Sequence, residues 1–189
     1  HEAIHEQVLS ALTERLRALR IGPGLSDPDL GPLISAKQFQ RAIGLVERAV
    51  GAGAQLLAGG RRAHVAGHEQ GWFLEGTLLA NVDADAEIWQ EEVFGPVLAA
   101  TTFRTDDEAV ALANSTEYGL VTGIWTRDVS RAHRVPRQIR SGQVYVNTYG
   151  AGGGVELPFG GFNRSGYGRG KGQEAMLTFS QVKNVCIAL

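Results

Sequence analysis

The chain has 189 residues, of which 43% are hydrophobic and 20% charged, and this composition predicts a globular protein with one sizeable core. Its net charge of −2 gives no electrostatic case for nucleic acid, and no stretch approaches the roughly 20 apolar residues that span a bilayer, so neither partner is expected. The single cysteine, Cys186, excludes an internal disulfide and suits a reducing compartment, so we expect a cytoplasmic protein.

Two amphipathic helices are predicted first. Apolar residues at steps of three and four indicate a helix over residues 4–19, which ends at Gly22-Pro23-Gly24. A second helix, over residues 39–50, carries an apolar stripe and stops at the glycines that follow. A short strand near Leu56 and an exposed connection over residues 59–71 come next.

Residues 97–146 form the best-patterned part of the chain. Thr105 begins a capping box for one helix, and Asp128 is placed to cap another, which Pro136 should kink or shorten. Between these helices lie apolar runs that predict strands at residues 97–103, 120–126 and 143–146. The order β-α-β-α-β predicts an α/β fold with right-handed crossovers.

The C-terminal region is rich in glycine. After Asn147 we expect a loop as far as Gly172, a short helix around Ala175 and a final strand over residues 182–187. Neither glycine-rich phosphate fingerprint is present, because Gly170-Lys171 lacks the spacing of a P-loop. If a dinucleotide binds, its pyrophosphate must rest mainly on protein outside this chain.

His1-Glu2-Ala3-Ile4-His5 matches the H-E-x-x-H pattern of zinc metalloproteases. The spacing would place two imidazoles one helical turn apart, with a glutamate beside them. However, the motif lies at the start of the chain, and no downstream residue stands out as a third ligand. We interpret it as a surface coincidence and expect no metal site, with a metalloprotease kept as an alternative.

Glu91-Glu92-Val93-Phe94-Gly95-Pro96 carries two interpretations. As structure, it is a solvated acid pair at a helix end followed by an aromatic residue and a turn. As a binding motif, one carboxylate accepts hydrogen bonds from both hydroxyls of a ribose, because a carboxylate only accepts and has lone pairs for two donors. The phenylalanine then forms one wall of a nicotinamide site.

These residues resemble the E-E-x-F-G-P motif of NAD(P)-dependent aldehyde dehydrogenases, in the C-terminal half of the catalytic domain. Further matches follow the order and spacing of that family: Asp27-Pro28, Gly31-Pro32-Leu33-Ile34, Gly59-Gly60, Asn114 to Leu120, Gly142, Val146-Asn147, Pro158-Phe159-Gly160-Gly161 and Ser165-Gly166-Tyr167-Gly168-Arg169. The resemblance implies that Glu92 binds the ribose and that Phe94 packs on the nicotinamide of NAD or NADP. It also implies a substrate pocket with Asn147 and Phe159.

The resemblance further implies a partial three-layer, parallel-sheet catalytic domain over residues 1–178 and an oligomerisation strand over residues 179–189. The nucleophilic cysteine and the general base of the family would lie upstream of His1, so no catalytic residue is expected in this chain. The whole enzyme would oxidise a small aldehyde to an acid through a cysteine thiohemiacetal, as a homodimer or homotetramer, whereas the fragment alone would be inactive. A non-catalytic interaction module remains the other alternative.

Three departures from the family pattern bear on the details. Gly170 stands where the family usually has a glutamate, so an ion pair or cap there is expected to be lost. Residues 150–154 are small where many relatives have a bulky side chain, which predicts a wide pocket. Leu74-Glu75-Gly76-Thr77 replaces a common proline-threonine pair.

Overall fold

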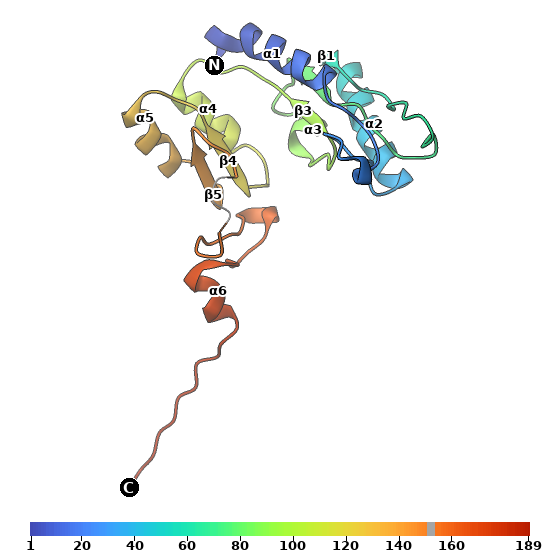
Figure 1. Cartoon of the computed structure of the whole chain (residues 1–189). Coiled ribbons are helices and arrows are strands. Elements are labelled where there is room, and N and C mark those ends of the chain that lie inside the picture. The colour runs from blue at the N-terminus through green and yellow to red at the C-terminus, as the bar shows by residue number, and fades with distance from the viewer. Residues whose placement is uncertain (151–153) are drawn as a thin grey trace. The chain divides into compact units, whose positions relative to one another are not determined.

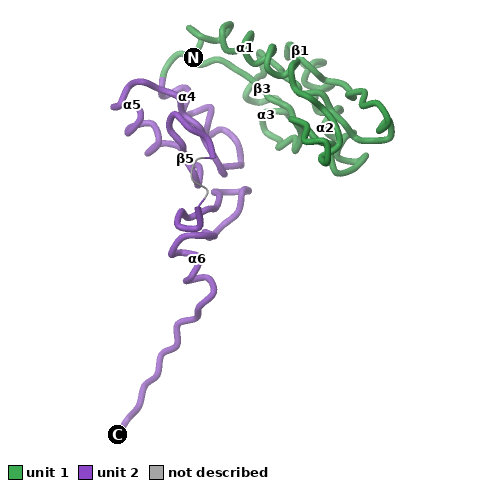
Figure 2. The backbone as a smooth tube through the Cα atoms, viewed as in Figure 1, with its two compact units in different colours: residues 1–105 green, residues 106–189 purple. Residues whose placement is uncertain are grey.

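The computed structural model describes residues 1–150 and 154–189. It divides into two compact units, residues 1–105 and residues 106–189 (Figure 2). Most of the segment that predicts a wide pocket, residues 151–153, lies outside the described residues. Among the described residues, no helix is long and apolar enough to cross a bilayer.

The first unit is a three-stranded sheet with helices (Figure 1). Its central strand, β2, pairs antiparallel with β1 and parallel with β3, with Thr77 opposite Val97. The elements in chain order are η1 (Glu2–Ile4), α1 (His5–Arg17), η2 (Gly24–Ser26), α2 (Ala36–Gly51), β1 (Gln55–Ala58), β2 (Thr77–Ala80), α3 (Glu87–Gln90) and β3 (Val97–Ala99).

The alternation of side chains along β2 builds three layers in this unit. Leu78 and Ala80 pack with Leu9 of α1, whereas Leu79 packs with α2 and α3 through Leu45 and Ile88. Successive strand residues point to opposite faces, so a fully buried strand needs a helix on each side. The predicted three-layer α/β architecture is confirmed here.

The two predicted helices are present, and Leu12 and Leu16 of α1 face the core as predicted, but the start of its predicted stripe does not. Ile4 and Val8 were expected on its apolar stripe, yet they are 50% and 43% exposed, and the buried residue is Leu9. The reason is that the sheet contact lies along Leu9, Leu12 and Leu16. Helix α2 buries Phe39 and Val46 of its predicted stripe, but Val50 at its end is 41% exposed. Ser35 Oγ caps this helix by accepting the Gln38 N–H at 3.2 Å.

The second unit is centred on a parallel pair of strands, β4 and β5. The Asp128 side chain caps α5 by accepting the Arg131 N–H at 3.1 Å, and α5 gives way to a 3-10 turn at Pro136, both as predicted. The elements are α4 (Asp106–Ala113), β4 (Val121–Ile124), α5 (Val129–Arg134), η3 (Val135–Arg137), β5 (Gln143–Val146), η4 (Asn163–Ser165) and α6 (Gly172–Thr178).

The predicted β-α-β-α-β order of residues 97–146 is present, but its first strand does not pair with the other two among the described residues. Among these strands β4 and β5 pair with each other in parallel, whereas β3 pairs in parallel with β2, which precedes the predicted run. Strand β3 also stops at Ala99 and does not continue to residue 103. An apolar run indicates a strand but does not show which strand will lie beside it. The neighbour of β3 is β2, about twenty residues earlier in the chain.

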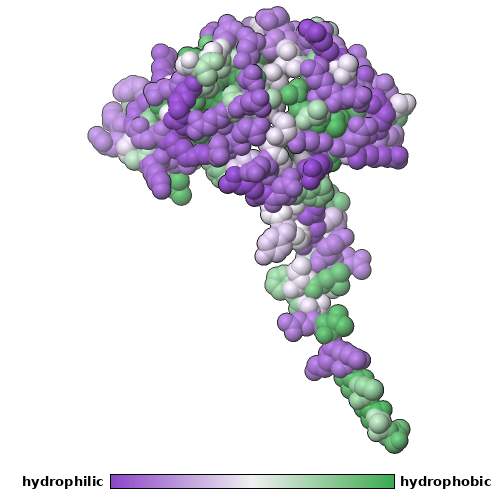
Figure 3. Space-filling model, turned by 180° about the vertical axis from the view of Figure 1, so that it is seen from behind, coloured by the Kyte–Doolittle hydropathy of each residue, from purple (hydrophilic) through white to green (hydrophobic). Residues whose placement is uncertain are grey.

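The C-terminal tail follows α6 as an exposed, extended segment (Figure 1). Residues 182–187 were predicted to form a strand, but no ladder is formed with any described residue. A strand is defined by its partner, and this segment has none within the described chain. Apolar side chains are exposed along it, including Val182, Val185 and Ile187 (Figure 3). An oligomerisation strand at residues 179–189 stays a prediction.

Candidate functional site

The predicted cofactor segment, residues 91–96, links α3 to β3. Glu91 ends α3, with its N–H donating to the Glu87 carbonyl oxygen at 2.8 Å. At the other end the Pro96 carbonyl oxygen accepts the Thr77 N–H of β2, also at 2.8 Å. The segment is therefore tied to a helix at one end and to the sheet at the other.

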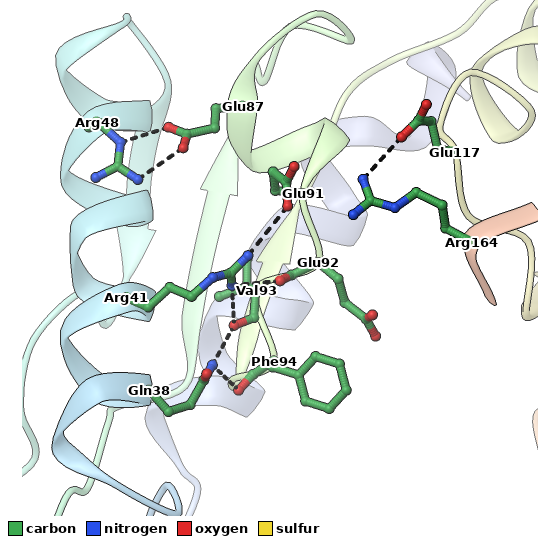
Figure 4. Close-up of polar contacts among 10 residues, drawn as sticks. All are labelled: Gln38, Arg41, Arg48, Glu87, Glu91, Glu92, Val93, Phe94, Glu117 and Arg164. Carbon is green, nitrogen blue, oxygen red and sulfur yellow. Dashed lines mark hydrogen bonds and ion pairs between the residues drawn. The ribbon is translucent and has the colours of Figure 1, made fainter. Parts of the chain in front are cut away.

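Two side chains of helix α2 hydrogen-bond to the backbone in the middle of this segment. Arg41 Nη1 donates to the carbonyl oxygens of Glu92 at 2.7 Å and Val93 at 3.1 Å. Gln38 Nε2 donates to the carbonyl oxygens of Val93 at 2.7 Å and Phe94 at 2.9 Å (Figure 4). Three consecutive carbonyl groups are thus bound by two side chains one helical turn apart.

A second contact joins α2 to α3 just before the segment. Arg48 Nε and Nη2 donate to the two Glu87 carboxylate oxygens at 2.6 Å and 3.1 Å. This bidentate hydrogen bond lowers the pKa of Glu87, since it stabilises the charged form. The α3 end of the segment is therefore also linked to α2.

The two glutamates of the motif have different surroundings. The Glu91 carboxylate pairs with Arg41 Nη2 at 3.5 Å. The Glu92 carboxylate is exposed and lies away from Arg41 (Figure 4), and none of the residues that the structure describes hydrogen-bonds to it. Glu92 is thus the carboxylate of the pair that is open to an external hydrogen-bond donor.

Phe94 presents its ring to the surface from a strained backbone. Its φ is +55°, in the left-handed region that costs a phenylalanine about 1 kcal/mol or more, and the residue is 71% exposed. An exposed ring of this size contributes little hydrophobic stabilisation to the unit. The observation favours a ligand-facing role for the ring.

Asn147, the first predicted substrate residue, directly follows β5 in the second unit. Its Oδ1 accepts the Thr126 N–H and its Nδ2 donates to the Thr126 carbonyl oxygen, both at 2.8 Å. Its φ of +57° is one that asparagine adopts more readily than most residues. The carboxamide therefore joins the ends of β4 and β5.

Phe159, the second predicted substrate residue, lies on the glycine-rich loop. Its N–H and carbonyl oxygen both bond to Gly170 at 2.7 Å, and Lys171 Nζ lies 5.7 Å from its ring centroid. The ring lines a surface pocket in this unit together with Gln143, Tyr145, Leu157 and Lys171. Asn147 contributes no lining to this pocket, so the structure does not bring the two predicted substrate residues to one described pocket.

The loop over residues 158–170 packs closely on two glycines. A Cβ on Gly142 would lie 1.6 Å from the Gly160 carbonyl oxygen, so no larger residue fits there. Ser165 Oγ accepts the Gly119 N–H at 3.1 Å, and Arg169 Nη1 donates to the Gly161 carbonyl oxygen at 3.1 Å. These contacts support a structural role for residues 165–169.

The residues of the H-E-x-x-H match have other contacts. His1 Nδ1 accepts the Ala3 N–H at 3.1 Å, and its ring packs edge-on against Phe103. Glu2 forms an ion pair with Arg104 at 2.8 Å. Across residues 1–150 and 154–189, no three histidine, cysteine, aspartate or glutamate side chains are grouped to hold a metal ion. Nothing in these contacts favours the metalloprotease alternative.

Comparison with known proteins identifies the family. The model of the aldehyde dehydrogenase family matches residues 1–185, almost the whole chain. The chain belongs to the aldehyde dehydrogenase family. The resemblance inferred from the E-E-x-F-G-P and glycine motifs is confirmed.

Individual relatives place the chain within longer aldehyde dehydrogenases. A betaine aldehyde dehydrogenase of Brucella anthropi is 38% identical over the full chain, which spans 39% of that relative. Among solved structures, a Burkholderia cenocepacia protein assigned to the aldehyde dehydrogenases is 49% identical, with a TM-score of 0.91 over 97% of this chain and 38% of its own. The Mycobacterium tuberculosis aldehyde dehydrogenase, solved with NAD+, is 39% identical, with a TM-score of 0.86 over 95% of this chain and 36% of its own.

Sequence reasoning missed Gln38 and Arg41. Gln38 is half-buried and Arg41 exposed on an ordinary amphipathic helix, whose polar positions carry no further signal. Their partners are 51 to 56 residues away and are backbone carbonyl groups, which leave no pattern in the sequence. Only the folded structure shows that they contact residues 92–94 of the predicted cofactor segment.

Proposed function

We propose that this chain is part of an NAD(P)-dependent aldehyde dehydrogenase, and that it supplies the residues that bind the ribose and the nicotinamide of the cofactor. The observation that carries the proposal is the occurrence, on one anchored segment, of the exposed Phe94 ring and of an exposed Glu92 carboxylate that no described residue hydrogen-bonds. Family membership and the relatives' NAD+ complex support it. The chain spans 39% of its curated relative, so the whole enzyme's activity is part of the proposal.

The residues present fit such a cofactor. The Glu92 carboxylate has lone pairs for two hydroxyl donors and no competing donor among the described residues. Phe94 offers an apolar face two residues away, and the Gln38 bond to its carbonyl oxygen keeps the backbone in the conformation that exposes the ring. A bound diol and a flat aromatic ring would therefore find complementary groups on one segment.

The cofactor, when bound, accepts a hydride from the substrate. The part of this chain in that reaction is to position reactants, because hydride transfer depends strongly on donor–acceptor geometry. Glu92 would hold the ribose by charge-assisted hydrogen bonds, and Phe94 would restrict the nicotinamide on one side. Asn147 and the pocket that includes Phe159 would contribute on the substrate side.

The nucleophilic cysteine and the general base would lie upstream of His1, so the full-length enzyme means this chain together with that upstream segment. We propose a small aldehyde as substrate and the cytoplasm as its compartment. The first curated relatives are named for betaine aldehyde, which makes this quaternary ammonium aldehyde the first substrate to test.

The decisive experiment compares two carboxamide variants in the full-length enzyme. Glu92→Gln removes the charge that binds the ribose, and its NAD+ dissociation constant should rise roughly tenfold or more, as expected for a charged hydrogen bond. Glu91→Gln is the matched control, because Glu91 already pairs with Arg41, and it should change NAD+ affinity little. The reverse result would show that the wrong carboxylate has been assigned. If the full-length protein oxidises no aldehyde and binds no NAD+, the interaction-module alternative is favoured.

A further inference from the structure

We infer that Gln38 and Arg41 of α2 are positioning residues that act through the backbone of residues 92–94 to aim the Glu92 carboxylate and the Phe94 ring. The inference rests on the proposed function of those two side chains. It assigns a role to two residues that would not touch the ribose through the contacts seen here (Figure 4).

The segment needs such support because it has no regular structure of its own. Its backbone-to-backbone hydrogen bonds lie at its ends, at Glu91, Gly95 and Pro96. Between them, the carbonyl groups of Glu92, Val93 and Phe94 are held by side chains of α2. The left-handed backbone of Phe94 persists only if its surroundings determine it, and the Gln38 bond to its carbonyl oxygen is one such restraint.

The donor chemistry of the two residues suits this task. A carboxamide nitrogen carries two hydrogens, which Gln38 directs at two neighbouring carbonyl oxygens. The guanidinium group of Arg41 is a rigid, planar donor, and its hydrogen bonds carry charge. Arg41 Nη1 binds the carbonyl groups of Glu92 and Val93, while its Nη2 pairs with the Glu91 carboxylate. The same side chain therefore engages the first acid and leaves the second free.

Helix α2 is a firm base for these contacts. Its apolar face, which adjoins Gln38 and Arg41, contributes Phe39, Ala42, Leu45 and Val46 to the core, each of them 5% exposed or less. Ser35 caps its start, one turn before Gln38. Buried, capped helices open rarely, so the donors stay in place while the exposed segment is held against them.

The test uses the full-length enzyme and starts from Gln38→Glu. This isosteric change replaces a donor by an oxygen that faces two carbonyl oxygens. Arg41→Gln removes the guanidinium group, and Arg41→Lys keeps the positive charge without the planar set of donors. Arg48→Gln is the matched control, because Arg48 lies on the same helix and pairs with Glu87 without touching residues 92–94.

We expect the first two variants to raise the NAD+ dissociation constant roughly tenfold, with little change in KM for the aldehyde. Arg41→Lys should restore part of that loss. In the cofactor-free protein, the amides of residues 92–95 should exchange hydrogen faster in Gln38→Glu and Arg41→Gln than in Arg48→Gln. In a Glu92→Gln background, Gln38→Glu should have a much smaller effect on NAD+ affinity, because residues that act through one another are not additive.

The outcomes separate this inference from the proposed function. If Glu92→Gln weakens NAD+ binding while Gln38→Glu and Arg41→Gln do not, the proposed function stands and the positioning role is overturned. Unchanged amide exchange at residues 92–95 overturns it too, as does a full, additive effect of Gln38→Glu on top of Glu92→Gln. If Glu92→Gln has no effect on NAD+ affinity, the proposed function itself fails.

Discussion

The Arg41 side chain binds the main chain of Glu92 and not its carboxylate. The guanidinium group donates to the Glu92 carbonyl oxygen at 2.7 Å, while the Glu92 carboxylate lies away from Arg41 (Figure 4). The charge of Arg41 is directed instead at Glu91. A pair of adjacent acids is thereby divided into one structural and one available carboxylate. In the aldehyde dehydrogenase family pattern, the available one is the residue that we assign to the ribose.

Replacement of Phe94 by glycine should separate stability from activity. Glycine adopts a φ of +55° without strain, so the melting temperature of the full-length enzyme should stay unchanged or rise slightly. Turnover should fall by about tenfold or more, because one wall of the nicotinamide site is lost. Val93→Ala is the comparison, since Val93 packs against the core and its truncation should cost about 1–2 kcal/mol. A large loss of stability in Phe94→Gly would contradict the strain argument.

The chain by itself should neither oxidise aldehydes nor bind NAD+ strongly. Contacts to ribose and nicotinamide are a small share of dinucleotide recognition when the pyrophosphate rests on other protein. The check is calorimetric titration of the 189-residue chain with NAD+, alongside an aldehyde oxidation assay. Saturable binding with a micromolar dissociation constant would show that the chain holds more of the cofactor site than we propose.

The ion pairs of Asp106 should make stability depend on pH at the acid end. Hydrogen bonds from Arg131 and then Arg134 lower the pKa of Asp106 below its ordinary value. A lowered folded-state pKa adds stability that is fully present above the unfolded pKa of about 4 and is lost as the pH falls through the folded value. Asp106→Asn should therefore cost up to about 1 kcal/mol at pH 7, and progressively less as the pH falls below the unfolded pKa.

Urea unfolding midpoints of the two proteins at several pH values test this, with Asp107→Asn as the control from the same helical turn. A difference between wild type and Asp106→Asn that is the same at every pH would contradict the assignment.

Deletion of residues 182–189 should change the assembly of the full-length enzyme. The tail exposes Val182, Val185, Ile187 and other apolar side chains, which an unpaired segment tolerates poorly unless it joins another sheet. We expect the intact enzyme to be a homodimer or a dimer of dimers, and the deleted form to be monomeric or insoluble. Light scattering measures this directly. An intact enzyme that is monomeric with or without the tail would refute the oligomerisation role.

The sequence alone was sufficient wherever the signal is local. The Asp128 cap, the shortening of α5 ahead of Pro136 and the burial of Phe39 and Val46 on α2 each depend on residues within about one or two helical turns. The motif of residues 91–96 identified the family for a related reason: its residue types and order are themselves the signal. The assignment of Glu92 over Glu91 came from that resemblance, and the surroundings of the two carboxylates agree with it.

Only the tertiary structure decided the long-range partners. Periodicity predicted a helix at the start of the chain, but packing against β1 and β2 selected Leu9 over Val8 as the buried residue. Apolar runs predicted strands, but hydrogen bonding placed β3 beside β2. Gln38 and Arg41 reach carbonyl groups more than fifty residues away. Such contacts depend on which distant segments the fold brings together. Every residue has a backbone carbonyl group, so no local sequence pattern marks the one that will be bound.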